Sequence, residues 1–277
     1  MSGEQVGATQ APRAKITAPR VIEMKRRNDP IVVVTAYDHP TARLADQAGV
    51  EILLVGDSLG QVVLGYESTL PVTMEDMLHH VKAVVRAKTS AMVVADMPFM
   101  SYQASVEDAV RNAGRLIQEG GADAVKLEGG ERVAAALQRI VEVGIPVMGH
   151  LGLTPQSVLA LGGYRVQARG EADQERLMRE AKGLESAGAF SVVLEGIPAR
   201  LGTTVSRELG IPTIGIGAGV GCDGQVLVTH DLLGFTLGHV PKFVRSYAAV
   251  ADTMRDAFER FAADVKARRF PGDRESY

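Results

Sequence analysis

The 277-residue sequence predicts an α/β protein, a closed (β/α)8 TIM barrel. Short apolar runs recur along the chain, and many of them deliver a polar or charged residue at or near their last position. Such uniformly apolar runs are typical of strands buried on both faces, as in parallel sheets. Segments with helical patterning alternate with the runs, which indicates crossover connections. Seven clear strands and a doubtful eighth favour a closed barrel over an open doubly wound sheet.

The expected strands share an apolar core bounded by glycine, proline or polar residues. In chain order they span residues 31–36, 51–55, 91–95, 124–127, 145–149, 190–194 and 212–216. A short eighth strand is expected around Val240.

The expected helices lie between these strands, and several of them are closed by a glycine. They span residues 17–27, 40–48, 73–87, 105–119, 131–143, 173–187, 199–208 and 246–268. Pro19 is tolerated in a first helical turn, and Thr73-Met-Glu-Asp76 resembles a capping box.

The composition is that of an ordinary soluble globular protein, with 46% hydrophobic and 23% charged residues. A net charge of −3 gives no general attraction for nucleic acid or for an anionic membrane. The apolar runs are far shorter than the ~20 residues that span a bilayer. A single cysteine, Cys222, excludes an intramolecular disulfide framework and a cysteine-based zinc cluster. We therefore expect a cytoplasmic protein with no nucleic-acid or membrane partner.

The domain organisation expected from the sequence is a disordered tail followed by one catalytic domain. Residues 1–18 are rich in Ser, Gly, Gln, Ala and Thr, without apolar periodicity and without the hydrophobic segment of a secretory signal. Residues 19–277 contain no linker-like stretch, so they are interpreted as a single barrel domain.

Polar side chains at the predicted strand ends are the candidate functional residues, because these ends converge on one mouth of a barrel. They are Asp57, Ser58, Asp96, Lys126, Glu128, His150 and Glu195. The carboxylates form a hard, oxygen-rich site of the kind that suits Mg²⁺, which also leaves positions for water and substrate. A 2-oxo acid could occupy two of those positions and form an enolate there.

Each candidate also has a structural interpretation. The aspartates could cap turns, Lys126 and Glu128 could form an ion pair, and His150 could be a satisfied core histidine. As a set they favour a site, because burying unpaired charge is costly. The glycine-rich stretch 215–221 keeps two interpretations, a phosphate-binding loop after strand seven or a close backbone approach.

Six longer motifs resemble the ketopantoate hydroxymethyltransferase family. They are Val55-Gly-Asp-Ser-Leu-Gly60, Thr69-Leu-Pro-Val-Thr73, Ala95-Asp-Met-Pro-Phe-Met100, Val125-Lys-Leu-Glu-Gly-Gly130, Gly149-His-Leu-Gly-Leu-Thr-Pro-Gln156 and Ile214-Gly-Ile-Gly-Ala-Gly219. The resemblance covers about residues 35–243.

The resemblance implies a barrel of the phosphoenolpyruvate/pyruvate superfamily and the first committed step of pantothenate biosynthesis. In that step a one-carbon unit passes from 5,10-methylenetetrahydrofolate to 3-methyl-2-oxobutanoate, giving 2-dehydropantoate. By motif, Asp57 and Asp96 are expected to bind Mg²⁺, with Glu128 in the metal shell. Substrate contacts are expected from Asp57, Ser58, Asp96, Lys126 and His150, and Glu195 resembles the general base. The resemblance also implies a homo-oligomer, typically a decamer.

Two other functions compete with this one. Another Mg²⁺-dependent 2-oxo acid enzyme, such as an isocitrate-lyase-like or phosphonopyruvate-type enzyme, would share the strand-end carboxylates. Such lyases usually employ a loop cysteine as the acid, however, and Cys222 lies in a glycine-rich turn. A non-catalytic barrel that binds an anionic metabolite would not need the combination of Lys126 and Glu195.

Overall fold

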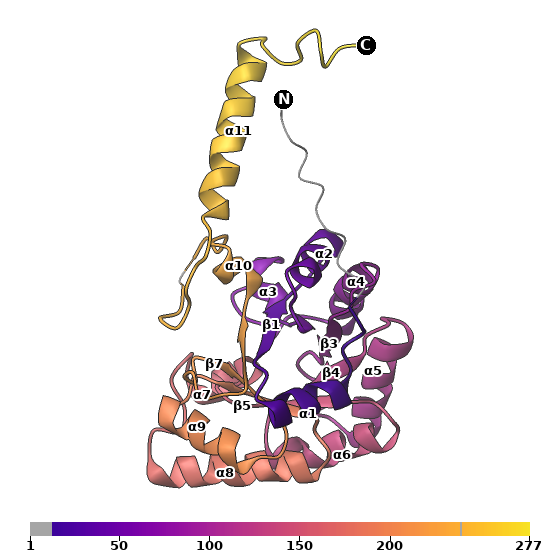
Figure 1. Ribbon diagram of the computed structural model, residues 1–277, viewed down its shortest axis with the longest axis vertical. Helices are drawn as coiled ribbons and strands as arrows, with labels where there is room; N and C mark the ends of the chain where they lie inside the picture. The colour runs from indigo at the N-terminus through magenta and orange to yellow at the C-terminus, as the bar shows by residue number, and fades with distance from the viewer. Residues whose placement is uncertain (1–12, 239) are drawn as a thin grey trace. The chain divides into compact units, whose positions relative to one another are not determined.

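The computed structural model describes residues 13–238 and 240–277 (Figure 1). The chain forms two compact units, the first running to Val226 and the second spanning Leu227–Tyr277. The single domain expected over residues 19–277 stays a prediction.

The strands form a closed barrel in the order of the sequence, as the alternation of apolar runs and helices predicts. They are β1 (Ile31–Thr35), β2 (Ile52–Val55), β3 (Met92–Asp96), β4 (Ala124–Lys126), β5 (Val147–Gly152), β6 (Ser191–Glu195), β7 (Thr213–Ile216) and β8 (Gly224–Leu227). The pairs from β1–β2 to β7–β8 are parallel. All their carboxyl ends therefore face the same mouth.

The eighth strand lies earlier in the chain than the sequence predicts. It is β8, and the expectation of a strand around Val240 is wrong, because Val240 itself is not in a strand. Gln225 is exposed, whereas Gly224 and Val226 are buried. This short alternating stretch lacks the continuous apolar run by which the other strands were predicted.

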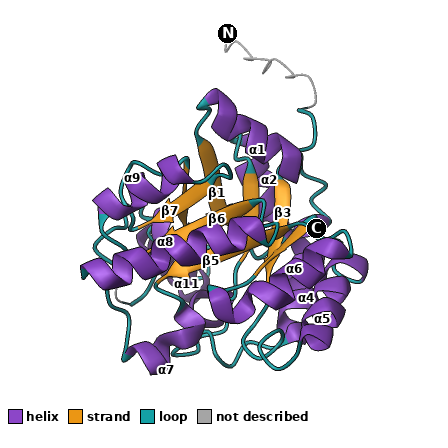
Figure 2. Cartoon of the chain, turned by 90° about the horizontal axis from the view of Figure 1, so that it is seen from below, coloured by secondary structure: helices purple, strands orange, loops and turns teal. Residues whose placement is uncertain are grey.

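Helices of the first unit surround the strands, as Figure 2 shows for α4, α5, α6 and α8. The helices are α1 (Ala18–Arg27), α2 (His39–Gln47), α3 (Leu59–Val62), α4 (Met74–Val85), α5 (Val106–Gln118), α6 (Ala134–Glu142), α7 (Val158–Leu161), α8 (Glu171–Ser186) and α9 (Ala199–Glu208), with 3₁₀ turns η1 (Glu131–Val133) and η2 (Pro155–Ser157). The sequence pattern predicts no helix at α3 or α7. Each is a single four-residue turn, too short to show a periodic pattern.

Capping residues explain where two of the predicted helices begin. The Thr73 hydroxyl accepts a hydrogen bond from the Asp76 amide at 3.1 Å, and the Asp76 carboxylate accepts one from the Thr73 amide at 3.0 Å. This reciprocal pair is a capping box at the start of α4, as predicted. The Ser105 hydroxyl accepts from the Asp108 amide at 3.1 Å in the same way at the start of α5.

The hydrophobic core fills the barrel interior and continues onto α1. Val21 and Met24, three residues apart on α1, are buried in the same cluster as residues of the strands. From the strands the cluster includes Ile31, Val33, Ile52, Leu54, Met92, Val94, Ala124, Met148, Val193, Ile214, Ile216 and Val226. Because α1 leads directly into β1, it closes the amino-terminal end of the barrel and leaves the carboxyl end for polar residues.

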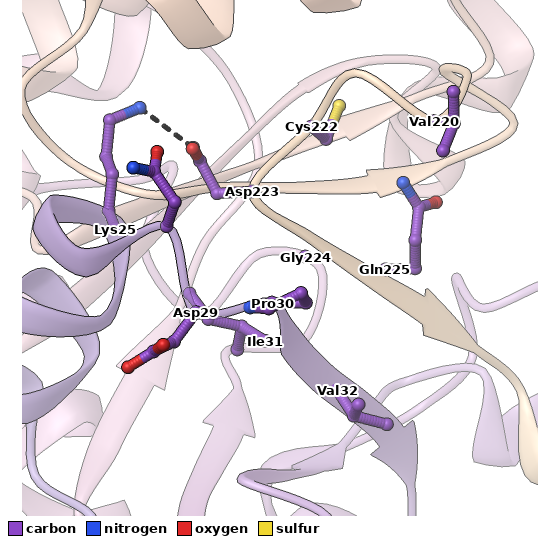
Figure 3. Close-up of a pocket in the computed structure, with 11 residues that line it drawn as sticks. Lys25, Asp29, Pro30, Ile31, Val32, Val220, Cys222, Asp223, Gly224 and Gln225 are labelled. Carbon is purple, nitrogen blue, oxygen red and sulfur yellow. Dashed lines mark hydrogen bonds and ion pairs between the residues drawn. The ribbon is translucent and has the colours of Figure 1, made fainter.

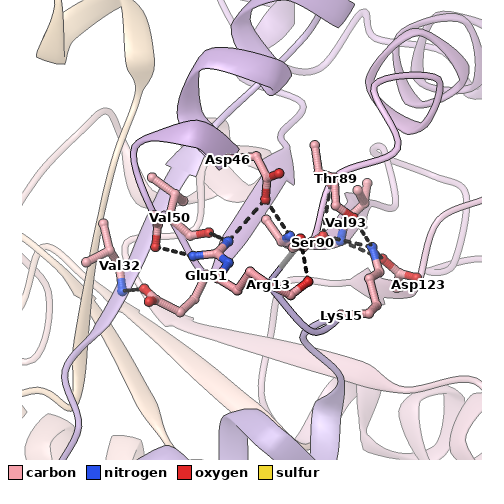
Figure 4. A network of polar contacts seen from close by, with 12 residues as sticks. Arg13, Lys15, Val32, Asp46, Val50, Glu51, Thr89, Ser90, Val93 and Asp123 are labelled. Carbon is pink, nitrogen blue, oxygen red and sulfur yellow. Dashed lines mark hydrogen bonds and ion pairs between the residues drawn. The ribbon is translucent and has the colours of Figure 1, made fainter. Parts of the chain in front are cut away.

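The segment just before α1 is tied to the loops at the same end of the barrel (Figure 4). Arg13 Nη1 donates to the Gly49 carbonyl at 2.5 Å. Lys15 Nζ donates to the Ala91 carbonyl at 2.8 Å and lies 2.7 Å from Asp123 Oδ2. Residues 1–12 of the predicted disordered tail lie outside the described residues, while 13–17 are held by these contacts.

One glycine of the stretch 215–221 is explained by close packing. Gly219 has a φ of +84°, and a Cβ there would overlap the first residue of α9, Ala199. This observation agrees with the close-approach interpretation of the stretch.

The second unit contains α10 (Thr229–Leu232) and α11 (Val250–Lys266). The Tyr247 amide donates to the Leu232 carbonyl at 2.7 Å, which connects the segment before α11 to α10. The predicted terminal helix is α11, and it begins at Val250, four residues later than the expected start at residue 246. Within the described ranges, no helix combines the length and the apolar character needed to cross a membrane.

Candidate active site

The structure places all seven predicted site residues at or just beyond the carboxyl ends of β2 to β6. Asp57 and Ser58 follow β2, Asp96 ends β3, Lys126 ends β4 with Glu128 two residues later, His150 lies in β5, and Glu195 ends β6. The parallel register pairs Asp96 with Lys126 and Gly152 with Glu195. Strand pairing therefore assembles these side chains from distant parts of the sequence.

Asp57 and Asp96 meet at the ends of neighbouring strands. The Asp57 amide donates a hydrogen bond to Asp96 Oδ2 at 3.0 Å, and both side chains are buried. Gly56 permits this approach, because a Cβ there would lie 2.7 Å from Ser58 Oγ and 3.4 Å from Asp96 Oδ2. The glycine in the Gly-Asp-Ser motif is thus required by the packing of the site.

Lys126 supplies the positive charge beside these carboxylates. Its Nζ lies 2.5 Å from Asp96 Oδ1, and both side chains are only 4% exposed. Burial opposes the charged form of Lys126, but the carboxylates of Asp96, Glu128 and Asp57 outweigh it and raise the pKa of the ammonium group. Lys126 therefore stays protonated in the site.

His150 bridges two carboxylates from different strands. Its Nδ1 lies 3.3 Å from Glu128 Oε1, and its Nε2 lies 3.2 Å from Glu195 Oε2. Burial and the charge of Lys126 oppose protonation, but Glu128 and Glu195 outweigh both and raise the pKa of His150 to about 9. At neutral pH His150 is therefore an imidazolium ion between two carboxylates.

The buried carboxylates respond differently to their surroundings. Burial, followed by the charges of Asp96 and Glu128, raises the pKa of Asp57 well above its ordinary value. Burial also raises the pKa of Asp96, although Lys126 opposes the change. Burial acts on Glu128 in the same direction, but its contacts with His150 and the charge of Lys126 lower the pKa below the ordinary value. The two aspartates therefore place two carboxylates close together in a buried region, with Lys126 as the ion-pair partner of Asp96.

The donor set at this region fits a hard divalent cation. Asp57, Asp96 and Glu128 offer buried carboxylate oxygens, of which Asp96 Oδ1 is already in contact with the Lys126 ammonium group. In that part of the chain, no three His, Cys, Asp or Glu side chains form a ready metal cluster. Mg²⁺ is compatible with such a site, because it is usually bound through one or two carboxylates and completes its shell with water and substrate oxygens.

Three further residues belong to the site that the sequence analysis did not single out. The Tyr37 hydroxyl lies 2.8 Å from Ser58 Oγ, and Gln156 donates to Asp57 Oδ2 at 2.9 Å. Tyr102 accepts a hydrogen bond from the Glu128 amide at 3.0 Å. They contact the predicted residues from loops, so a search of strand ends alone does not find them.

The cavity shown in Figure 3 is a separate feature of the first unit. It has a volume of about 400 Å³ and is lined by residues that include Lys25, Pro30, Ile31, Asp223 and Gly224. Lys25 lies in α1 and the others lie at the starts of β1 and β8, whereas the seven predicted residues lie at strand carboxyl ends. Barrel enzymes carry their active sites at the carboxyl ends, so this cavity is not the candidate active site.

Two solved structures show the same fold as this chain. Phosphonopyruvate hydrolase in complex with oxalate and Mg²⁺ superposes with a TM-score of 0.61 at 13% identity, covering 94% of this chain and 93% of that one. A 2,3-dimethylmalate lyase of the PEP mutase/isocitrate lyase superfamily superposes with a TM-score of 0.61 at 19% identity. The superposition covers 95% of this chain and 89% of the lyase. Identities this low establish the fold alone.

Sequence relatives are much closer. The chain is 57% identical over 270 residues to the 3-methyl-2-oxobutanoate hydroxymethyltransferase of Syntrophus aciditrophicus, covering 98% of this chain and 99% of the relative. It is also 57% identical to the enzyme of the same name from Moorella thermoacetica, and the match covers 96% of this chain and 99% of the relative. A family model described as ketopantoate hydroxymethyltransferase matches residues 15–273. The chain therefore belongs to the ketopantoate hydroxymethyltransferase family.

Proposed function

We propose that this protein transfers a hydroxymethyl unit from 5,10-methylenetetrahydrofolate to 3-methyl-2-oxobutanoate, forming 2-dehydropantoate for pantothenate biosynthesis. Family membership and the names of the 57% identical relatives support the acceptor and the group transferred. The observation that carries the proposal is the assembly of three buried carboxylates, Lys126 and His150 at the carboxyl ends of adjacent strands. This arrangement suits an anionic substrate that must lose a proton from carbon.

The 2-oxo acid would bind beside Asp57 and Asp96, with Ser58 and Lys126 as further contacts. The Ser58 hydroxyl is positioned by Tyr37 at 2.8 Å. The Lys126 ammonium group lies in a buried environment, where its charge acts more strongly on a developing enolate oxygen than it would in water. Lys126 would therefore stabilise the negative charge that appears when C3 loses its proton.

Mg²⁺ would be held by Asp57 and Asp96, with Glu128 in its shell. When bound, it would supply Lewis-acid polarisation of the 2-oxo group. The raised pKa values of Asp57 and Asp96 are consistent with this assignment, since a cation would relieve the burial of two like charges.

Glu195 would remove the C3 proton. Its side chain is 16% exposed, compared with 3% for His150 and for Glu128, so it is the more accessible of the two carboxylates that contact His150. The His150 imidazolium would hold the Glu195 carboxylate towards the mouth. The C3 carbanion would then form a bond to the methylene carbon of the folate. As this bond forms, the methylene carbon's bond to one folate nitrogen breaks, and water then supplies the hydroxyl oxygen as the bond to the second nitrogen breaks. The C3 proton and one proton of the water go to the two nitrogens, and tetrahydrofolate leaves.

The resemblance also leads us to propose a homo-oligomer, specifically a decamer. Sedimentation equilibrium of the full chain tests this state directly. A monomer or dimer at micromolar concentration would contradict it.

Product analysis tests the proposed reaction. The purified protein is incubated with 3-methyl-2-oxobutanoate, 5,10-methylenetetrahydrofolate and Mg²⁺, and 2-dehydropantoate is quantified by mass spectrometry. We expect product only when all three components are present, and none after EDTA treatment. Cleavage of a 2-hydroxy acid without folate would point instead to a lyase, and absence of product from folded, Mg²⁺-loaded protein would contradict the proposal.

A further inference from the structure

Gln156 is buried at the centre of the candidate active site, although it is neither charged nor at a strand end. It lies in η2, in the loop that follows β5, and is only 5% exposed. A buried amide must find partners for two N–H groups and a carbonyl oxygen, because each unmet group would be costly. The partners of Gln156 therefore reveal what the residue is placed to do.

The side-chain amide of Gln156 connects Asp57, which follows β2, to the loop that follows β3. Nε2 donates to Asp57 Oδ2 at 2.9 Å and to the Met97 carbonyl at 2.9 Å. Oε1 accepts from the Tyr102 hydroxyl at 2.7 Å and from Gln103 Nε2 at 3.0 Å. The Met97 carbonyl can only accept, so the NH₂ group must face it and the orientation of the amide is determined.

The backbone of the same residue reaches a second carboxylate. The Gln156 amide N–H donates to Glu128 Oε2 at 3.0 Å. Glu128 Oε1 lies 3.3 Å from His150 Nδ1, so each oxygen of this carboxylate has a separate partner. Tyr102 completes the connection, because its hydroxyl bonds both Gln156 Oε1 and the Glu128 amide.

We propose that Gln156 is a positioning residue that holds the Asp57 and Glu128 carboxylates in the orientation needed to receive a divalent cation. The inference deepens the proposed function and rests on it. A neutral amide is suited to this role because it restrains a carboxylate through hydrogen bonds and leaves its negative charge for the cation. A lysine at the same place would neutralise that charge.

If Gln156 has this role, replacing it should weaken metal binding in a protein that still folds. Partners that orient metal ligands typically contribute about 10- to 100-fold in affinity. Gln156→Met keeps the approximate volume and removes both side-chain donors. Gln156→Glu keeps the shape but turns an oxygen towards Asp57 Oδ2. We expect Mn²⁺ to bind at least about 10-fold more weakly to Gln156→Met than to the wild type, and more weakly still to Gln156→Glu.

The experiment measures Mn²⁺ binding to the full protein by electron paramagnetic resonance, without substrate, alongside thermal melting in EDTA. Gln103→Ala is the matched control, since Gln103 Nε2 donates to Gln156 Oε1 and Gln103 Oε1 accepts from the Tyr102 amide. It should bind Mn²⁺ like the wild type, whereas Tyr102→Phe, which loses one partner of Gln156 Oε1 and the acceptor of the Glu128 amide, should bind Mn²⁺ more weakly.

Several outcomes would overturn the inference. If Gln156→Met folds and binds Mn²⁺ like the wild type, the Asp57 and Glu128 carboxylates do not need Gln156 for their orientation. If Gln156→Met does not fold, wild-type-like Mn²⁺ binding by Tyr102→Phe has the same meaning. A wild type that binds no Mn²⁺ would overturn the metal requirement of the proposed function, and the inference with it.

Discussion

His150 Nε2 lies 3.2 Å from Glu195 Oε2, so a buried imidazolium ion contacts the carboxylate that we propose as the base. The contact joins β5 to the end of β6. It restricts the Glu195 side chain, and the second His150 nitrogen is occupied by Glu128. Proton removal by Glu195 would therefore start from a carboxylate in contact with a buried cation.

Replacing Glu195 tests its role as the base. Glu195→Gln keeps the shape of the side chain but cannot accept the C3 proton. We expect the rate of turnover to fall by about 10²–10⁴-fold, because general base catalysis contributes on this order. Binding of 3-methyl-2-oxobutanoate, measured by calorimetry with Mg²⁺, should change little. The control is Glu208→Gln on the surface, which should turn over normally. Near-normal turnover by Glu195→Gln would mean that another group is the base.

Asp57→Asn should separate stability from function. The raised pKa of Asp57 means that its charged form is disfavoured in the folded protein, chiefly by burial. Removing that charge should leave the melting temperature in EDTA unchanged or raise it, by about 2–4 °C for each kcal/mol recovered. Binding of Mg²⁺ and of the 2-oxo acid should be largely lost. A variant that titrates Mg²⁺ like the wild type would refute the assignment of Asp57 as a ligand.

The raised pKa of His150 predicts that the metal-free protein loses stability at alkaline pH. Its pKa is raised from 6.5 to about 9, so its contribution is fully present below pH 6.5 and is lost as the pH rises through 9. The difference corresponds to about 3 kcal/mol. Urea unfolding in EDTA between pH 6 and 10 should show a fall in stability that His150→Gln lacks. Parallel curves for the two proteins would contradict the imidazolium assignment.

Two glycines with almost the same φ angle offer a matched comparison. Gly152 and Gly144 have φ values of +92° and +93°. A Cβ at Gly144 meets nothing within 4 Å, whereas a Cβ at Gly152 would overlap the Glu195 carbonyl. Gly144→Ala should cost about 1–2 kcal/mol of unfolding free energy from the backbone strain alone.

Gly152→Ala should cost the same strain and an additional displacement of the Glu195 backbone. Turnover should therefore fall in this variant and stay normal in Gly144→Ala. Thermal melting and product formation measured on both variants check the comparison. Equal activity in the two would mean that the position of Glu195 tolerates such a shift.

The barrel and the placement of its charged residues could be predicted because both depend on one local pattern. Continuous apolar runs such as Ile52–Val55 are buried on both faces, and the first polar residues after them fall at the strand's carboxyl end. Asp57 is found in this way, and Lys126 and Glu195 occupy the last positions of their strands. Their roles in the reaction stay predictions, since location does not measure chemistry.

The residues that were missed lack that local signal. β8 has an exposed Gln225 between two buried residues, so it does not form an apolar run. Gln156 and Tyr102 lie in loops, and their importance comes from contacts across 28 and 26 residues to Glu128. Such long-range pairs become visible only when the strands are assembled in space.

Solvent exchange at C3 of 3-methyl-2-oxobutanoate is the most direct test of the proposed function. The substrate is incubated with enzyme and Mg²⁺ in D₂O, without folate, and the C3 proton signal is followed by NMR. We expect exchange that requires both enzyme and metal and that is lost in Glu195→Gln. Absence of exchange from folded, metal-loaded wild type, both without folate and with tetrahydrofolate added, would contradict proton removal at this site.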